Sequence, residues 1–121
     1  GVALLEDEAL LNQVLCVWFN TLNRELLLRT SALVHAVVYG DRGAAGRLVS
    51  LHLPAISCLI VRQAAAEEDQ DVLTEVIGAL HILSADPLLG PPLRGEGDMA
   101  GALCSAVCAR CSDAMVVMEN L

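Results

Sequence analysis

Residues 41–86, DRGAAGRLVSLHLPAISCLIVRQAAAEEDQDVLTEVIGALHILSAD, decide the fold class of this chain. Apolar residues recur in this stretch every three or four positions, the period of an α-helix, and the alternation typical of β-strands is nearly absent. Pro54 fits the first turn of a helix, and Asp86-Pro87 ends a later one. The stretch therefore predicts three helices, over 41–51, from 53 into the alanines at 64–66, and over 71–84.

The helical period continues on both sides of this stretch. Before it, helices are expected over 8–20 and 24–39, the second ending at Gly40. After it, 87–97 carries three Pro and three Gly, which predicts a loop. We therefore expect an all-α fold of one domain, 1–121, made of a partial repeat unit (8–40), a full unit (41–86), a loop (87–97) and a C-terminal helix (98–121).

Two sequence matches indicate the internal repeat. Cys16 in VLCVWF matches Cys58 in ISCLIV, and SALVHAVV (31–38) matches GALHILSA (78–85). Both matches are spaced by roughly forty to forty-seven residues, which is typical of helical solenoids with two or three helices per repeat. Each hairpin would have more apolar surface than it can bury alone, so the hairpins are expected to stack into one continuous core.

The stretch 41–86 resembles an armadillo repeat, and a HEAT repeat almost equally. It has a short first helix, the run LHLPAISCLI where armadillo repeats open their second helix with G-x-L-P-x-L-V, an acidic hairpin loop, and a third helix ending GALHIL. His52 stands where the family has Gly, and His35 and Ile82 stand where peptide-binding members place Asn. The resemblance implies a superhelix fragment of about two to three stacked repeats from a longer protein.

Charge and hydropathy exclude two classes of partner. Fifteen acidic residues face seven Arg, and the net charge of −8 argues against nucleic acid, because phosphate binding needs clustered basic side chains. No apolar run approaches the ~20 residues of a membrane-spanning helix, so no membrane partner is expected. The acidic clusters at 6–8 and 67–69 are interpreted as solvated loops or, alternatively, as groups that steer a basic partner toward the protein.

The C-terminal cysteines have the only spacing that suggests metal chemistry. Cys104, Cys108 and Cys111 spell C-x-x-x-C-x-x-C, an iron–sulfur pattern. Together with Met115 and Met118 they also fall at helical spacing, so we interpret them as a core stripe of the last helix and expect no metal and no cofactor. An odd number of cysteines within apolar helices favours reduced thiols in an intracellular protein, cytoplasmic or nuclear.

The stacked hairpins predict a non-enzymatic scaffold that binds a peptide or helix of a partner protein, with a basic or amphipathic segment as the candidate ligand. The third helices of the units are expected to line a concave face. Their polar or small positions are the candidate partner-binding residues: Ser31, His35, Glu75, Gly78 and His81. Trp18 is either a core anchor or an exposed hot spot. The alternative function is homo-oligomerisation, which would hide the Cys104–Met118 face or the Trp18 region against a second copy.

Overall fold

The computed structural model describes residues 8–121, and every regular element in that range is a helix. The predicted all-α class is therefore confirmed. The helices are α2 (Glu8–Asn20), α3 (Arg24–Gly40), α4 (Arg42–Ser50), α5 (Leu53–Ala66), α6 (Gln70–Ala85), α7 (Gly90–Arg94), α8 (Met99–Cys108) and α9 (Asp113–Asn120). Most of the first acidic cluster, Glu6 and Asp7, lies outside the described residues.

Short polar side chains set the starts of three helices. Asn23, Asp41 and Asp69 cap α3, α4 and α6, and each accepts a hydrogen bond from the backbone N–H three residues later. Such caps satisfy a donor that the helix itself leaves unpaired. The start of α5 differs, because Pro54 occupies its first turn and His52 precedes it with a φ of 81°. His52 therefore takes the left-handed conformation that usually favours glycine.

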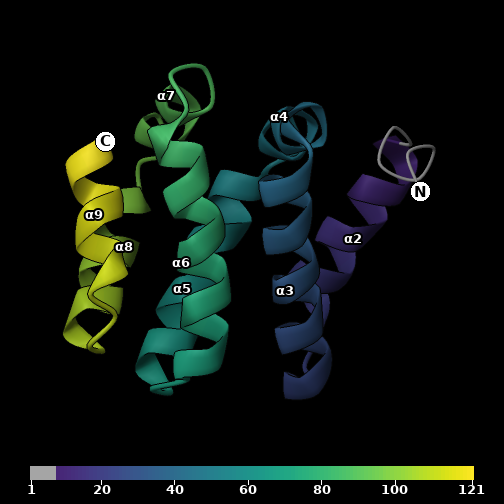
Figure 1. Ribbon diagram of the computed structural model, residues 1–121. Coiled ribbons are helices and arrows are strands. Elements are labelled where there is room, and N and C mark those ends of the chain that lie inside the picture. Colours follow the sequence, from purple (N-terminus) through teal and green to yellow (C-terminus); the bar gives the residue numbers. More distant parts are fainter. Residues whose placement is uncertain (1–7) are drawn as a thin grey trace.

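The helices form two rows (Figure 1). Helix α3 packs along α6 and α6 along α9, while α2 packs on α5 and α5 on α8 behind them. Each row therefore brings together helices that are far apart in the sequence. The short helices α4 and α7 lie at the upper end of the view, where the chain passes from one group of helices to the next.

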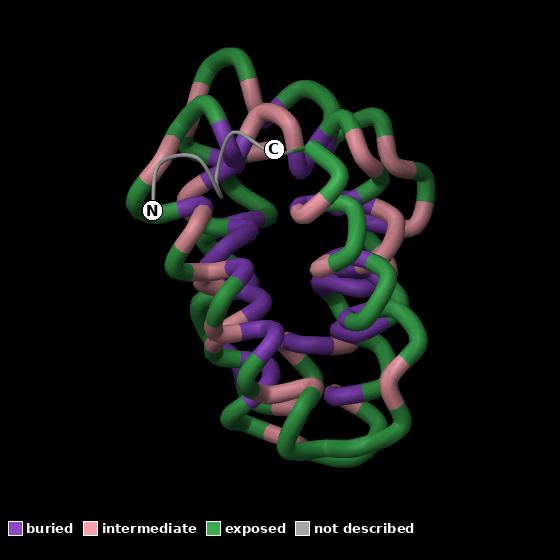
Figure 2. Tube along the Cα trace, turned by 90° about the vertical axis from the view of Figure 1, so that its right-hand side faces the viewer, coloured by how far each residue is buried: buried purple, intermediate pink, exposed green. Residues whose placement is uncertain are grey.

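The core lies between the two rows. In Figure 2 the buried stretches of each row face the other row, and the exposed stretches lie on the outside. The largest fully buried side chains come from seven of the eight helices, so a single core runs the length of the stack: Trp18, Leu15, Leu48, Leu53, Leu73, Ile77, Leu80, Leu83, Leu93, Leu103, Val34 and Val61.

The C-terminal region differs from the sequence prediction in two ways. The loop at 87–97 contains the helix α7, and the single helix expected over 98–121 is broken between Cys108 and Asp113. The break is a left-handed residue, Arg110, with a φ of 70°. The N–H of Cys111 reaches the carbonyl of Ala106 at 2.9 Å, which ends α8 with the hydrogen bonding of a Schellman motif.

The predicted core stripe of cysteines and methionines is consequently wrong for four of its five members. Cys104 and Cys108 are exposed, and Met115 and Met118 are 53% and 38% exposed. Only Cys111 is buried. The turn at Arg110 breaks the helical register only for Met115 and Met118, whereas Cys104 and Cys108 precede it and lie on the exposed side of α8.

The length and apolar character of the helices within residues 8–121 bear on whether any of them could cross a membrane. No single helix combines the length and the apolar character needed to cross a membrane. Helices α4 and α5 together meet both criteria, but they are bent by 82° at their junction.

Candidate functional site

The predicted partner-binding residues of α3 and α6 meet where these two helices pack. The Nδ1 atom of His35, on α3, lies 2.9 Å from the Oε2 atom of Glu75, on α6. Both side chains are about one-third exposed, at 32% and 30%. The pair therefore joins two helices at the surface, and part of the imidazole ring and part of the carboxylate remain open to solvent.

Gly78 allows this close approach. A Cβ atom at position 78 would lie 2.6 Å from Cε1 of His35 and 2.9 Å from its Nε2. The imidazole ring thus occupies the space that any larger residue would need. Three of the five predicted residues, His35, Glu75 and Gly78, form one contact.

His81 lies on the outer surface of α6, one turn beyond Gly78. It is exposed, as are Asp71 and Thr74, and the spacing of these residues places them on one stripe of the helix. Within residues 8–121 the His81 ring has no hydrogen-bond partner. Thr74 and His81 are therefore open to solvent on this stripe, whereas Asp71 is paired with Arg24.

Ser31 and Trp18 are both buried in the core. Ser31 is fully buried, at 0% exposure, and its Oγ accepts a 2.9 Å hydrogen bond from Nε1 of Trp18. Trp18 is 1% exposed. The prediction of Ser31 as a binding residue and of Trp18 as a hot spot is therefore wrong, and the core-anchor interpretation of Trp18 is correct. A buried indole N–H requires a partner, and the nearest helix supplies the serine hydroxyl.

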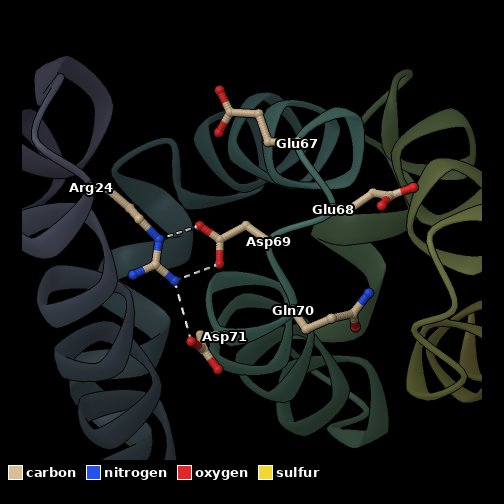
Figure 3. Close-up of a pocket in the computed structure, with 6 residues that line it drawn as sticks. All are labelled: Arg24, Glu67, Glu68, Asp69, Gln70 and Asp71. Carbon is tan, nitrogen blue, oxygen red and sulfur yellow. Dashed lines mark hydrogen bonds and ion pairs between the residues drawn. The ribbon is translucent and has the colours of Figure 1, made fainter.

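The acidic loop between α5 and α6 forms the second open surface. In Figure 3, Arg24 reaches across from α3, and its guanidinium donates to both carboxylate oxygens of Asp69 at 2.9 Å and to Asp71 at 3.2 Å. Glu67 and Glu68 point away from Arg24 toward solvent. A shallow pocket of about 390 Å³ lies among these residues and Gln70.

The charges of this loop have two distinct roles. Hydrogen bonding from Arg24 holds the pKa of Asp69 below its ordinary value, and Asp69 also caps α6. The Asp69 carboxylate therefore already has hydrogen-bond partners within the fold. Glu67 and Glu68 are exposed and make no ion pair with the described residues. They are the groups of this cluster that remain available to a basic partner.

Two further ion pairs join one helix to a segment much later in the chain. Arg42 of α4 donates to both carboxylate oxygens of Asp86, and Arg62 of α5 does the same to Asp98. The hydrogen bonds from Arg42 lower the pKa of Asp86 to about 2. Sequence reasoning missed both pairs, because the partners are distant in sequence and only the stacking of helices brings them together.

The cysteines differ in exposure: Cys58 and Cys111 are buried, and Cys16, Cys104 and Cys108 are exposed. No group of three His, Cys, Asp or Glu side chains within residues 8–121 is placed to hold a metal ion. Burial raises the pKa of the Cys58 thiol to about 12, so this thiol stays protonated at neutral pH. Sequence reasoning had matched Cys58 with Cys16, but Cys16 is exposed, and the two surroundings differ.

Tyr39 is an exposed residue that the sequence prediction overlooked. It is 81% exposed at the C-terminal end of α3, on the same stripe as His35. Its place one helical turn after His35 was a signal that the sequence offered. The site is thus an outer face of α3 and α6, with the acidic loop at one end.

Comparisons of this chain with protein-family models, with curated proteins and with solved structures give no match.

Proposed function

We propose that this chain is a protein-interaction scaffold of stacked helical hairpins, related in architecture to armadillo and HEAT repeats, and that it has no catalytic role. The observation that carries the proposal is the exposed face of α3 and α6, on which polar and aromatic groups from two stacked helices lie together. Solenoid proteins use such continuous helix rows as binding surfaces.

A shared turn supports the repeat architecture. Two residues after the end of α5 lies Glu68, with a φ of 54°, just as Arg110, with a φ of 70°, lies two residues after the end of α8. After each of these residues, the next N–H bonds to the carbonyl at the start of the last helical turn, from Asp69 to Ala64 and from Cys111 to Ala106. Two hairpins of different sequence therefore turn by the same hydrogen-bonding motif, as repeats of one supersecondary unit would.

The contacts across the stack also follow one pattern. Arg24, the first residue of α3, donates to Asp69 before α6. Gln70, the first residue of α6, donates from its Nε2 to the carbonyl of Ala109 before α9. In both cases a side chain at a helix start reaches the turn that precedes the neighbouring helix of the same row. This supports a stack in which each unit contacts the next in an equivalent way.

The charge of the face supports a basic or amphipathic segment as the ligand. The exposed groups of the loop include Glu67 and Glu68, and the whole chain has a net charge of −8. Exposed charges of one sign speed the approach of an oppositely charged partner and make its binding dependent on salt. Tyr39 adds an aromatic contact of the kind enriched in interfaces.

The test compares a charge change on this face with the same change elsewhere. Fluorescent helical peptides of equal length, one set basic and one acidic, would be titrated with the chain and followed by anisotropy. The double variant Thr74→Arg/His81→Arg should weaken the best basic peptide by up to about thirtyfold, because each exposed charge contributes up to ~1 kcal/mol. Leu59→Arg/Gln63→Arg, at two exposed positions of α5, adds the same charge and is the matched control.

The control should bind as the wild type does, and both variants should keep the wild-type helicity and melting temperature. Equal binding by the double variant and the wild type would assign recognition to another surface. If neither set of peptides binds at low salt, the scaffold proposal for this face fails.

A further inference from the structure

Cys104 and Cys108 are two exposed cysteines on one helix, α8. They lie four residues apart, so their side chains are on the same side of the helix, with Cβ atoms about 5–6 Å apart. Neither belongs to the core, and Cys111, the third cysteine of the sequence motif, is buried beyond the turn at Arg110. The thiol chemistry open to solvent in this region therefore belongs to the pair.

The two cysteines line one groove between α5 and α8. Its volume is about 410 Å³, and Arg62 and Glu68 also line it. Arg62 donates to both carboxylate oxygens of Asp98, which balances its charge. Glu68 is exposed and makes no ion pair with the described residues. The groove therefore combines two soft sulfur ligands with one unbalanced negative charge, which favours a cation over an anion.

The spacing of the two cysteines opposes a direct bond between their sulfurs while α8 stays helical. A disulfide needs Cβ atoms about 3.5–4.5 Å apart, less than the ~5–6 Å between positions one turn apart. A metal ion between two thiolates makes a longer bridge, because each metal–sulfur bond is about 2.3 Å for zinc, whereas the single S–S bond is about 2.05 Å. The pair therefore fits a bridging ion better than a disulfide.

The number of ligands selects the ion. Zinc takes four protein ligands in structural sites and three in catalytic sites. Within residues 8–121 no three His, Cys, Asp or Glu side chains are placed to share a metal ion, so the groove offers two thiolates. Thiolates are soft ligands that select Cu(I), and Cu(I) is stable between two of them in a near-linear arrangement.

We propose that Cys104 and Cys108 bind one Cu(I) ion in the groove between α5 and α8. Two S–H bonds are replaced by two S–Cu bonds, and two protons pass to solvent. Copper stays in the +1 state, so the step consumes no oxidant and no reductant. The site lies on the row of α2, α5 and α8, and it does not depend on ligand binding to the α3–α6 face.

The test is a competition for Cu(I) between the reduced chain and a coloured Cu(I) chelator, without oxygen or added thiols. The wild type should withdraw one equivalent of copper. Cys104→Ser and Cys108→Ser should each bind it at least about tenfold more weakly, because even the loss of a group that only orients a metal ligand costs about 10–100-fold. Both positions are exposed, so serine should leave the helicity unchanged.

Two controls separate this pair from thiols in general. Cys16→Ser removes the other exposed cysteine and should bind Cu(I) as the wild type does. Cys108→Ser/Thr74→Cys keeps five cysteines but moves one of them to an exposed position of α6. This relocated variant should bind as weakly as Cys108→Ser.

Three results would overturn the proposal. The first is a wild type that takes no copper from the chelator. The second is unchanged binding by Cys104→Ser and Cys108→Ser, which would place the ion elsewhere, as at Cys58 and Met99, whose sulfurs lie 3.9 Å apart. The third is full binding by the relocated variant, which would show that the number of thiols matters and their spacing does not.

Discussion

Replacing Gly78 with alanine tests the contact at the centre of the proposed face. In a helix interior, Gly→Ala normally stabilises a protein by about 0.5–1 kcal/mol, because alanine has less conformational freedom to lose on folding. Here the added Cβ would lie 2.6 Å from Cε1 of His35, so the ring must leave its place. Forcing extra volume into a well-packed core costs about 1–3 kcal/mol, and the His35 ring, which is 32% exposed, can move aside at a cost near the lower end, about 1 kcal/mol. Gly78→Ala should therefore lose the usual helix gain and change the free energy of unfolding by only about 0–0.5 kcal/mol in the destabilising direction.

Two companion variants separate the causes. At Gly46, in α4, an added Cβ meets only Leu89 Cδ2 at an ordinary 3.7 Å, so Gly46→Ala should show the full helix gain of about 0.5–1 kcal/mol. In a His35→Ala background the obstacle at position 78 is gone, and Gly78→Ala should then stabilise by a similar amount. The double-mutant cycle between positions 35 and 78 should give a coupling of about 1 kcal/mol.

The assay is urea denaturation followed by circular dichroism, with the slope m compared among all variants. The ion pair between His35 and Glu75 contributes little to these figures, because partly exposed pairs are worth about 1 kcal/mol or less. The reasoning is refuted if Gly78→Ala stabilises the protein as much as Gly46→Ala does. It is refuted equally if the effect of Gly78→Ala is the same with and without His35.

Three other predictions follow from the polar contacts and the thiols. Ser31→Ala should destabilise the fold by about 1–3 kcal/mol in urea denaturation, because it leaves the buried indole N–H of Trp18 unpaired. The double variant Trp18→Phe/Ser31→Ala should cost less than the sum of the two single changes, and strict additivity would contradict the hydrogen bond. The pKa of Asp86 falls from 3.8 to about 2 on folding because Arg42 donates to its carboxylate. Its stabilising contribution is therefore complete above the ordinary pKa and is lost as the pH falls from 3.8 toward 2, so the urea midpoint should drop over that window, less steeply for Asp86→Asn. In the native state a thiol reagent should quickly modify the three exposed cysteines and not Cys58 or Cys111, with all five reacting in urea; rapid native labelling of either buried thiol would count against the packing of α5 and α8.

Local patterns predicted much of the secondary structure and little of where the helices end. Apolar residues that recur every three to four positions identified the five helices α2 to α6. The sequence prediction failed where a non-glycine residue takes a left-handed conformation. Arg110 carries no signal for a helix end, so 98–121 was expected to be one helix. Its conformation accompanies the hydrogen bonds that close the last turn of α8, from the Arg110 N–H to Val107 and from the Cys111 N–H to Ala106, and an arginine has no intrinsic preference for it.

The sequence likewise identified some residues of the candidate site and misassigned one of them. His35, Glu75 and His81 were found because polar residues on a mostly apolar helix stand out in sequence. Ser31 was misassigned for the same reason, since a buried serine and an exposed one have the same pattern. Which of the two it is depends on Trp18, whose indole N–H reaches it from α2.

The sequence by itself determined that the chain is helical and acidic and that its helices have apolar faces too large to bury singly. These properties arise from side-chain chemistry and local period, which each segment carries alone. Only the tertiary structure decided the register of one hairpin on the next: that His35 meets Glu75 over Gly78, that Arg24 reaches Asp69, and that an apolar pocket is left beside Met118. The physical reason is that these contacts join residues distant in sequence, and their partners are fixed by the shape of the packed helices rather than by any local pattern.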